Sequence, residues 1–260
     1  MGSKFISEER RESFAIIRLN RPEKFNVLSR EMIVALSEIF TNMENKPDLR
    51  AIILTGAGDK AFCAGTDITE LTELTTIQAL EVAERGQSLC NLIGNCGVPV
   101  IAAVNGIAAG GGCELALACH VRMASPNASF SLPETKLGII PGYGGTQRLA
   151  REVGRGRALE IILTGRTVRA EEALRIGLTN RVAGTAGLLT EAEGLAREIS
   201  NLAPLAIRAC LEAVTRGTDL PKAEGLALEA QLFSSLFATN DVREGTRAFL
   251  EKRSPVFNGN

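Results

Sequence analysis

Two glutamates are the residues of this sequence whose type and placement could do chemistry. Glu114 follows three consecutive glycines in AAGGGCELAL, and Glu134 stands in the apolar stretch FSLPETKLGIIPG. A buried carboxylate is unfavourable unless it is paired or hydrogen-bonded, so an acidic residue in apolar company usually has a task. General acid–base work is one task, and a helix cap or an ion pair with a lysine such as Lys136 is the other. Each glutamate alone leaves both possibilities open, and the presence of both favours chemistry.

The glycine run predicts a backbone that takes unusual torsion angles or comes very close to another group. Glycine loses the most chain entropy on folding, so three in a row between an apolar strand and a helix are informative. The first turn of that helix offers unpaired N–H groups, which can stabilise an oxyanion. The stretch FCAGTDI contains a second such turn at Gly65 and Thr66, so the two turns could give one N–H each to a single oxygen. A tight packing turn is the structural alternative.

The elements that must position these residues follow from hydrophobic periodicity. Strands are predicted at residues 13–19, 51–54 and 99–104, and helices at 75–92 and from a cap at Ser29 to before Pro47. Short, continuous apolar runs are typical of strands buried on both faces, and their alternation with helices predicts right-handed βαβ crossovers. Beyond about residue 152 strand signals nearly vanish, and helices are predicted at 157–163, 170–176, 188–202, 204–215, 221–236 and 241–252. We therefore expect an α/β core with a helical appendix.

Composition excludes several classes of function. The 260 residues carry 29 Lys and Arg against 30 Asp and Glu, a formal charge of −1, so the surface as a whole is not that of a nucleic-acid or anionic-membrane binder. Any anionic ligand must be held locally. Aromatic residues make up 4% of the chain, too few for a site of stacked bases. The most apolar stretch, residues 98–119, contains Asn105, Glu114 and several glycines, and we interpret it as buried core rather than a membrane span.

The cysteines and the histidine point to a reducing compartment and away from metal. Six cysteines form no CxxC pair, and His120 is the single histidine. Structural zinc is not expected, and reduced, buried thiols fit a cytoplasmic setting, in agreement with an N-terminus that has no apolar export segment. A hydrolase with a Ser-His-Asp or Cys-His arrangement would need His120 itself as its base.

Five motifs occur in order along the chain: NRPEKFNVLS at residues 20–29, AFCAGTDI at 61–68, VPVIAAVNGIAAGGGCELALAC at 98–119, PETKLGIIPGYGGTQRL at 133–149 and FLEKRSPVF at 249–257. Together they closely resemble the crotonase family, the enoyl-CoA hydratases and isomerases. The resemblance implies a spiral of ββα units over residues 1–195, holding the coenzyme A site and the catalytic site. It also implies a helical region, residues 196–260, for trimerisation and further coenzyme A contacts, giving a homotrimer or a dimer of trimers.

The resemblance also implies a role for individual residues. The backbone N–H groups of Thr66 and Gly111 would form an oxyanion hole for the thioester carbonyl of an acyl-CoA. Glu114 would help to hold the attacking water, and Glu134 would donate the proton at C2. The substrate contacts carried over from the family are Lys24, Ala64, Thr66, Asp67, Ile68, Gly111, Gly142, Phe249 and Lys252. No metal and no cofactor is expected, since coenzyme A arrives with the substrate. These residues predict hydration of a 2-enoyl-CoA.

Two departures from the family pattern and several alternatives accompany this prediction. Thr66 stands where many relatives have alanine, and its side chain would narrow the pocket or add a polar contact. His120 replaces an aspartate, and we interpret it as structural.

Three alternatives to this prediction stay open. An isomerase that moves a Δ3 double bond to Δ2 could use Glu134 alone. The others are a methylglutaconyl-CoA hydratase-like enzyme with RNA binding and a coenzyme A-binding scaffold without activity. Residues 68–87 are expected to form the wall that selects the acyl chain.

Overall fold

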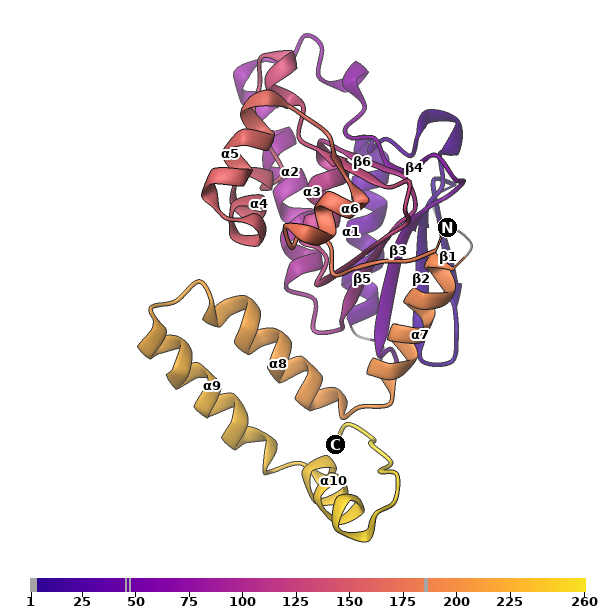
Figure 1. Cartoon of the computed structure of the whole chain (residues 1–260), viewed down its shortest axis with the longest axis vertical. Helices are drawn as coiled ribbons and strands as arrows, with labels where there is room; N and C mark the ends of the chain where they lie inside the picture. Colours follow the sequence, from indigo (N-terminus) through magenta and orange to yellow (C-terminus); the bar gives the residue numbers. More distant parts are fainter. Residues whose placement is uncertain (1–3, 45, 47, 185–186) are drawn as a thin grey trace.

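Two β-sheets form the body of the protein in the computed structural model, which describes residues 4–44, 46, 48–184 and 187–260 (Figure 1). The first sheet has the strand order β1-β2-β3-β5-β7-β10, and the second has the order β4-β6-β8-β9. Only the β1–β2 and β8–β9 pairs are antiparallel among these neighbours. The strands are β1 (Ile6–Arg10), β2 (Phe14–Leu19), β3 (Ala51–Gly56), β4 (Ala61–Cys63), β5 (Val100–Val104), β6 (Ile107–Ala109), β7 (Val121–Ala124), β8 (Ser129–Ser131), β9 (Val168–Arg169) and β10 (Arg181–Val182).

Successive turns of the chain place one strand in each sheet and then a helix. β3 and β4 are followed by α2 (Thr76–Gly94), and β5 and β6 by α3 (Gly111–Ala118). β7 and β8 lead to the short helix η3 (Glu134–Leu137), then α4 (Gly145–Val153) and α5 (Arg155–Thr164). The chain returns through β9, α6 (Ala170–Arg175) and β10. This repetition confirms the predicted spiral of ββα units.

The first sheet is buried on both faces, as its continuous apolar runs predict. Ile17 and Leu54, which are partners across β2 and β3, face the main core. Ile16 and Ile53, the preceding pair, face α7 (Leu188–Ser200), which covers the opposite side with Ala192 among other residues. The period-2 alternation of a strand therefore divides the apolar side chains between two cores.

Local signals explain where the helices begin. The Ser29 hydroxyl accepts a hydrogen bond from the Met32 N–H at the start of α1 (Arg30–Glu44), as the sequence predicts. α2 opens with a reciprocal capping box between Thr75 and Gln78. The strands that the sequence analysis did not predict, β1, β4 and β6–β10, are two to five residues long. In so few residues periodicity is not visible.

The C-terminal helices form an arm that extends away from the body (Figure 1). α8 (Pro204–Gly217) and α9 (Lys222–Leu236) lie side by side, and neither contains a buried residue. α10 (Asn240–Glu251) lies at the far end. α7 runs across positions 195 and 196, so the predicted division of the chain there lies within one helix; the division itself stays a prediction. None of the helices in the described part of the chain has the length and apolar character needed to cross a membrane.

Candidate active site

A cavity of about 1170 Å³ opens between α2, the N-terminus of α3, η3 and the segment that leads into α4. It brings together residues from three of the motifs that the sequence analysis singled out. Seven of the predicted site residues line it: Ala64, Thr66, Ile68, Gly111, Glu114, Glu134 and Gly142. Its walls are apolar toward the loop after β4 and toward α2, where the lining residues are Ile68, Leu71, Leu74, Ala79, Val82 and Ala83. These belong to the stretch 68–87 that was expected to form the wall for the acyl chain.

The backbone at Thr66 is turned toward the cavity by a bridge to Leu28. The Leu28 N–H donates to Gly65 O (2.7 Å), and the Asp67 N–H donates to Leu28 O (2.8 Å). In a parallel bridge the residue between those two groups directs its own N–H to the other side. Among the described residues no acceptor bonds the N–H of Thr66 or that of Gly111, the first residue of α3. A Cβ built on Gly65 would lie 3.9 Å from Gly111 N, which places the two segments side by side.

The glycine run has both of the properties that were predicted for it. Gly110 takes φ +50°, which L side chains rarely adopt. A Cβ on Gly112 would lie 2.0 Å from Cys63 O, and one on Gly111 would lie 2.9 Å from the Thr66 hydroxyl. α3 can therefore start directly against β4, with its unpaired first-turn N–H groups at the cavity.

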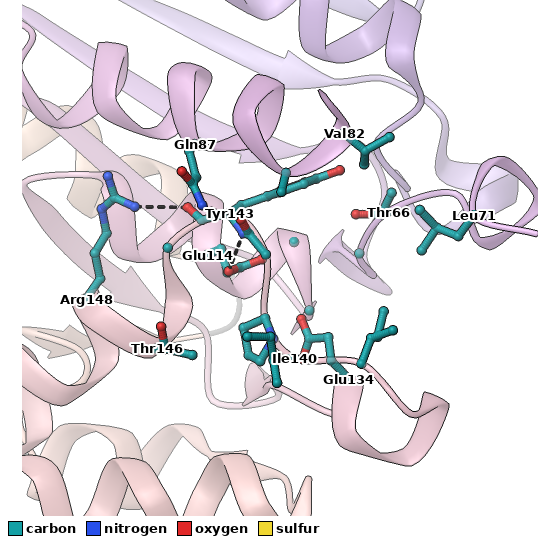
Figure 2. Close-up of a pocket in the computed structure, with 18 of the residues that line it drawn as sticks. Thr66, Leu71, Val82, Gln87, Glu114, Glu134, Ile140, Tyr143, Thr146 and Arg148 are labelled. Carbon is teal, nitrogen blue, oxygen red and sulfur yellow. Dashed lines mark hydrogen bonds between the residues drawn. The ribbon is translucent and has the colours of Figure 1, made fainter. Parts of the chain in front are cut away.

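Glu114 is buried and is held by backbone donors. Its Oε1 accepts hydrogen bonds from the N–H of Tyr143 (2.8 Å) and of Gly145 (2.7 Å) (Figure 2). Burial raises the pKa of the Glu114 carboxyl to about 7, against the lowering effect of these two bonds and of the Arg148 charge. The Glu134 charge raises it further. This carboxylate is therefore fixed in position and titrates near neutrality.

Glu134 is buried as well, but its surroundings hold it less. It is the first residue of η3, and its Oε2 has no hydrogen-bond partner in the described part of the chain. Desolvation by burial raises its pKa, partly offset by a bond to its own backbone N–H. A Cβ built on Gly110 would lie 3.2 Å from its Oε1, so the side chain lies against the glycine run. Among the residues that the structure describes, neither glutamate forms an ion pair. Lys136 instead donates to Gly165 O (2.7 Å).

The sequence analysis gave no individual role to four residues that shape the site: Tyr143, Arg148, Gln87 and Asn91. The Tyr143 ring lies on Gly86 of α2, where a built Cβ would fall 2.0 Å from it. Its hydroxyl is buried; the Thr66 side chain beside it lowers the Tyr143 pKa, against the larger raising effect of burial. Arg148 and Gln87 donate to the carbonyls of residues 143 and 142 (both 3.0 Å), and Asn91 accepts from Arg148 (2.7 Å). The one available signal was the motif GYGGTQR, which places the only tyrosine of the chain between glycines.

Four predicted substrate contacts do not line the cavity: Lys24, Asp67, Phe249 and Lys252. Lys24 is exposed on the short helix η1 (Pro22–Lys24), and its charge helps to lower the pKa of Asp67, after the larger effect of the hydrogen bond from Thr69. Phe249 of α10 and Lys252, which follows α10, are exposed and do not line the cavity; α10 itself lies at the far end of the arm (Figure 1).

His120 has a structural environment, as predicted. Its Nδ1 accepts from the Val100 N–H (2.9 Å), so its Nε2 carries the proton that points to Gly94 O (3.2 Å). Burial lowers its pKa, which keeps the ring neutral. The Cys63 thiol has a pKa raised to about 12 by burial, which does not suit a nucleophile.

Comparison with known proteins gives the family. The model of the enoyl-CoA hydratase/isomerase family matches residues 9–260. The chain is 43% identical to a crotonyl-CoA hydratase of Syntrophomonas wolfei (99% of each chain covered) and 41% identical to a short-chain-enoyl-CoA hydratase of Clostridium acetobutylicum (94% of each). A crystal structure of an enoyl-CoA hydratase from Bacillus anthracis superposes with a TM-score of 0.96 at 40% identity, covering 99% of this chain and 100% of that one. Family model, relatives and fold agree, and the chain belongs to the enoyl-CoA hydratase/isomerase family.

Proposed function

We propose that the protein is an enoyl-CoA hydratase, which adds water across the 2,3 double bond of a 2-enoyl-CoA. The observation that carries this proposal is that two buried carboxylates, Glu114 and Glu134, face one cavity. Beside them lie the N–H groups of Thr66 and Gly111, which no acceptor in the described residues bonds. Hydration needs one group to take a proton from water and another to supply a proton to carbon. The names of the two curated relatives support the reaction and favour a short acyl chain.

In the proposed mechanism the thioester oxygen accepts hydrogen bonds from the N–H groups of Thr66 and Gly111. Glu114 takes a proton from water while the water oxygen bonds to C3, and the electron pair of the double bond moves into an enolate that these two donors stabilise. The enolate then takes a proton from Glu134 at C2, and transfer of one proton from Glu114 to Glu134 restores the enzyme. The pKa of Glu114, about 7, leaves a substantial fraction ionised at neutral pH.

Coenzyme A binding and assembly belong to the same proposal. Lys24 and the loop of Ala64, Asp67 and Ile68 would contact coenzyme A in the chain that holds the acyl group. Phe249 and Lys252 would reach the coenzyme A of a neighbouring subunit, since both are exposed and do not line the cavity of their own chain. A homotrimer, or a dimer of trimers, would cover the apolar side chains that the arm exposes. The apolar side chains of the arm that are more than half exposed are Leu202, Val214, Leu226, Phe233, Phe237, Phe249, Leu250 and Val256.

The test is loss of the ultraviolet absorbance of the enoyl thioester across short, long and branched 2-enoyl-CoAs, with Glu134→Gln as the control. Turnover by the wild-type protein that the variant lacks would support the hydratase. No turnover of any substrate would contradict it.

An isomerase is the second candidate. Glu134 Oε2 has no hydrogen-bond partner among the described residues, so it could move a proton between C2 and C4 without help from Glu114. Glu114→Ala separates the two. It should abolish hydration in a hydratase, and it should spare conversion of a Δ3-enoyl-CoA to its Δ2 isomer in an isomerase.

A further inference from the structure

The segment of residues 142–145 is held from two opposite sides. On one side the N–H groups of Tyr143 and Gly145 donate to Glu114 Oε1 (2.8 and 2.7 Å). On the other side Gln87 Nε2 donates to Gly142 O and Arg148 Nη1 donates to Tyr143 O, both at 3.0 Å (Figure 2). The segment is thus a connection between these two side chains and the carboxylate.

One peptide unit carries the connection from Gln87. The carbonyl of Gly142 and the N–H of Tyr143 belong to the same planar, trans peptide, so they point in opposite directions. Gln87, this peptide and Glu114 therefore form a continuous chain of hydrogen bonds from α2 to α3. Hydrogen bonds in such a chain polarise one another, so a donor on the Gly142 carbonyl makes the Tyr143 N–H a better donor to the carboxylate.

The connection from Arg148 also depends on α2. Asn91 lies one helical turn after Gln87, on the same face of α2. Its Oδ1 accepts from Arg148 Nη2 (2.7 Å), which directs the other guanidinium nitrogen to Tyr143 O. The positive charge of Arg148 also favours the ionised form of Glu114, and the negative charge of Glu134 across the cavity opposes it. The other titratable groups that face Glu114 are Cys90, Cys113 and Tyr143, whose pKa values burial raises, so they stay uncharged.

We propose that Gln87 and Arg148 are positioning residues, which act through the 142–145 segment to hold the Glu114 carboxylate ionised and in its water-binding orientation. This inference rests on the proposed function, because Glu114 must be ionised to take a proton from water. Both residues line the cavity, but their part in the reaction is to hold the segment and not to contact the reacting atoms.

The test is the pH dependence of kcat/KM for hydration in Gln87→Leu, which removes the donor at similar size. The lost hydrogen bond should raise the pKa of Glu114 and move the acid limb of the profile up by about half a pH unit. Arg148→Gln, which removes the charge, should move the limb in the same direction. Glu84→Leu, at an exposed position of α2 outside the cavity lining, is the control and should leave the limb in place.

The inference is overturned if the acid limb of the kcat/KM profile stays in place in both variants. It is also overturned if the maximal kcat/KM falls without a shift of the limb, since a merely structural role would give that result. A second measurement does not need hydration. The infrared carbonyl band that Glu114→Gln removes reports the titration of Glu114 directly, and Gln87→Leu should move its midpoint up by the same amount. If the wild-type protein hydrates no substrate, the proposed function fails, and an unshifted infrared midpoint would separately overturn the role of Gln87.

Discussion

The regions around Glu114 and Glu134 present carboxylates to the same cavity in opposite ways. Glu114 has two backbone donors on one oxygen, and a segment tied to α2 holds those donors. Glu134 has an oxygen without a partner in the described part of the chain, on a helix of four residues. Burial raises the pKa of both. The difference teaches that burial can raise the pKa of two carboxylates that are held very differently. Glu114, fixed by two donors, suits holding water, and Glu134, with one oxygen unbonded in the described part of the chain, suits delivering a proton.

The two local sequences account for the difference. GYGG lets Gly144 take φ +104° and brings Gly145 so close that a Cβ on it would lie 2.9 Å from Glu114 Oε1. After Glu134, ETKL forms η3, which ends at Gly138 with φ +78°. In the described part of the chain no backbone N–H donates to Glu134 Oε2.

The largest effect is expected from replacing Glu134, the carboxylate with fewer hydrogen bonds. Glu134→Gln should lower kcat for hydration about 10³- to 10⁴-fold, because the amide cannot deliver a proton to C2. Stopped-flow absorbance of the enoyl thioester measures it, with Glu114→Gln beside it. A loss in Glu114→Gln that exceeds the loss in Glu134→Gln by tenfold or more would reverse the comparison.

A smaller loss should follow when the fixed carboxylate is displaced without being removed. Gly145→Ala would put a Cβ 2.9 Å from both Cγ and Oε1 of Glu114, so the side chain must move and its backbone donors must separate. We expect kcat to fall about 10- to 100-fold. Gly156→Ala, a helical position of α5 with nothing within 4 Å of the built Cβ, is the matched control and should retain full activity. Equal activity in the two variants would contradict the fixed geometry of Glu114.

The stability of the fold should also depend on Glu114. Its pKa in the folded protein, about 7, lies above the ordinary 4.5, so between these pH values the folded state binds more protons than the unfolded state. The free energy of unfolding therefore falls as pH rises through this window, by roughly 1–3 kcal/mol. Glu114→Gln should remove this part of the slope and be the more stable protein at pH 8. Urea unfolding at pH 4.5 and pH 8 measures it, and parallel pH dependences of the two proteins would rule the effect out.

The smallest effect concerns the Tyr143 side chain, because its backbone and not its hydroxyl holds Glu114. The hydroxyl is buried with the Thr66 side chain as its polar neighbour, while the ring packs on Gly86. Tyr143→Phe keeps the ring, so kcat/KM should change by less than about threefold. Steady-state kinetics with the preferred 2-enoyl-CoA decides this. A loss above tenfold would show that the hydroxyl contacts the substrate and would weaken the distinction between the two regions.

The parts of the fold that could be predicted are those with long or repeated signals. The apolar run of β3 and the capped, periodic helix α1 are visible in the sequence because burial imposes a pattern on many residues. β9 and β10 have two residues each, and their pairing depends on strands that lie far away in the chain. The spiral came from the family resemblance, since no pattern of residues indicates that successive strands enter different sheets.

The candidate site was predictable where a residue is unusual for its surroundings. Glu114 and Glu134 are acids in apolar stretches, and three consecutive glycines precede the first. Gln87 and Asn91 are ordinary polar residues on a helix, and nothing in their neighbourhood in the sequence indicates that the segment 142–145 lies against them. Their part depends on tertiary contacts that only the fold supplies.

The cysteines differ in burial, so a thiol-reactive dye can be attached to one chosen place in the protein. Cys63, Cys90, Cys96, Cys113 and Cys119 are buried, whereas Cys210 is exposed on α8 of the arm. A maleimide dye reacts with accessible thiolates, so it should attach once per chain, to the arm, with no residue changed. Energy transfer between donor- and acceptor-labelled chains would then report how subunits associate and exchange.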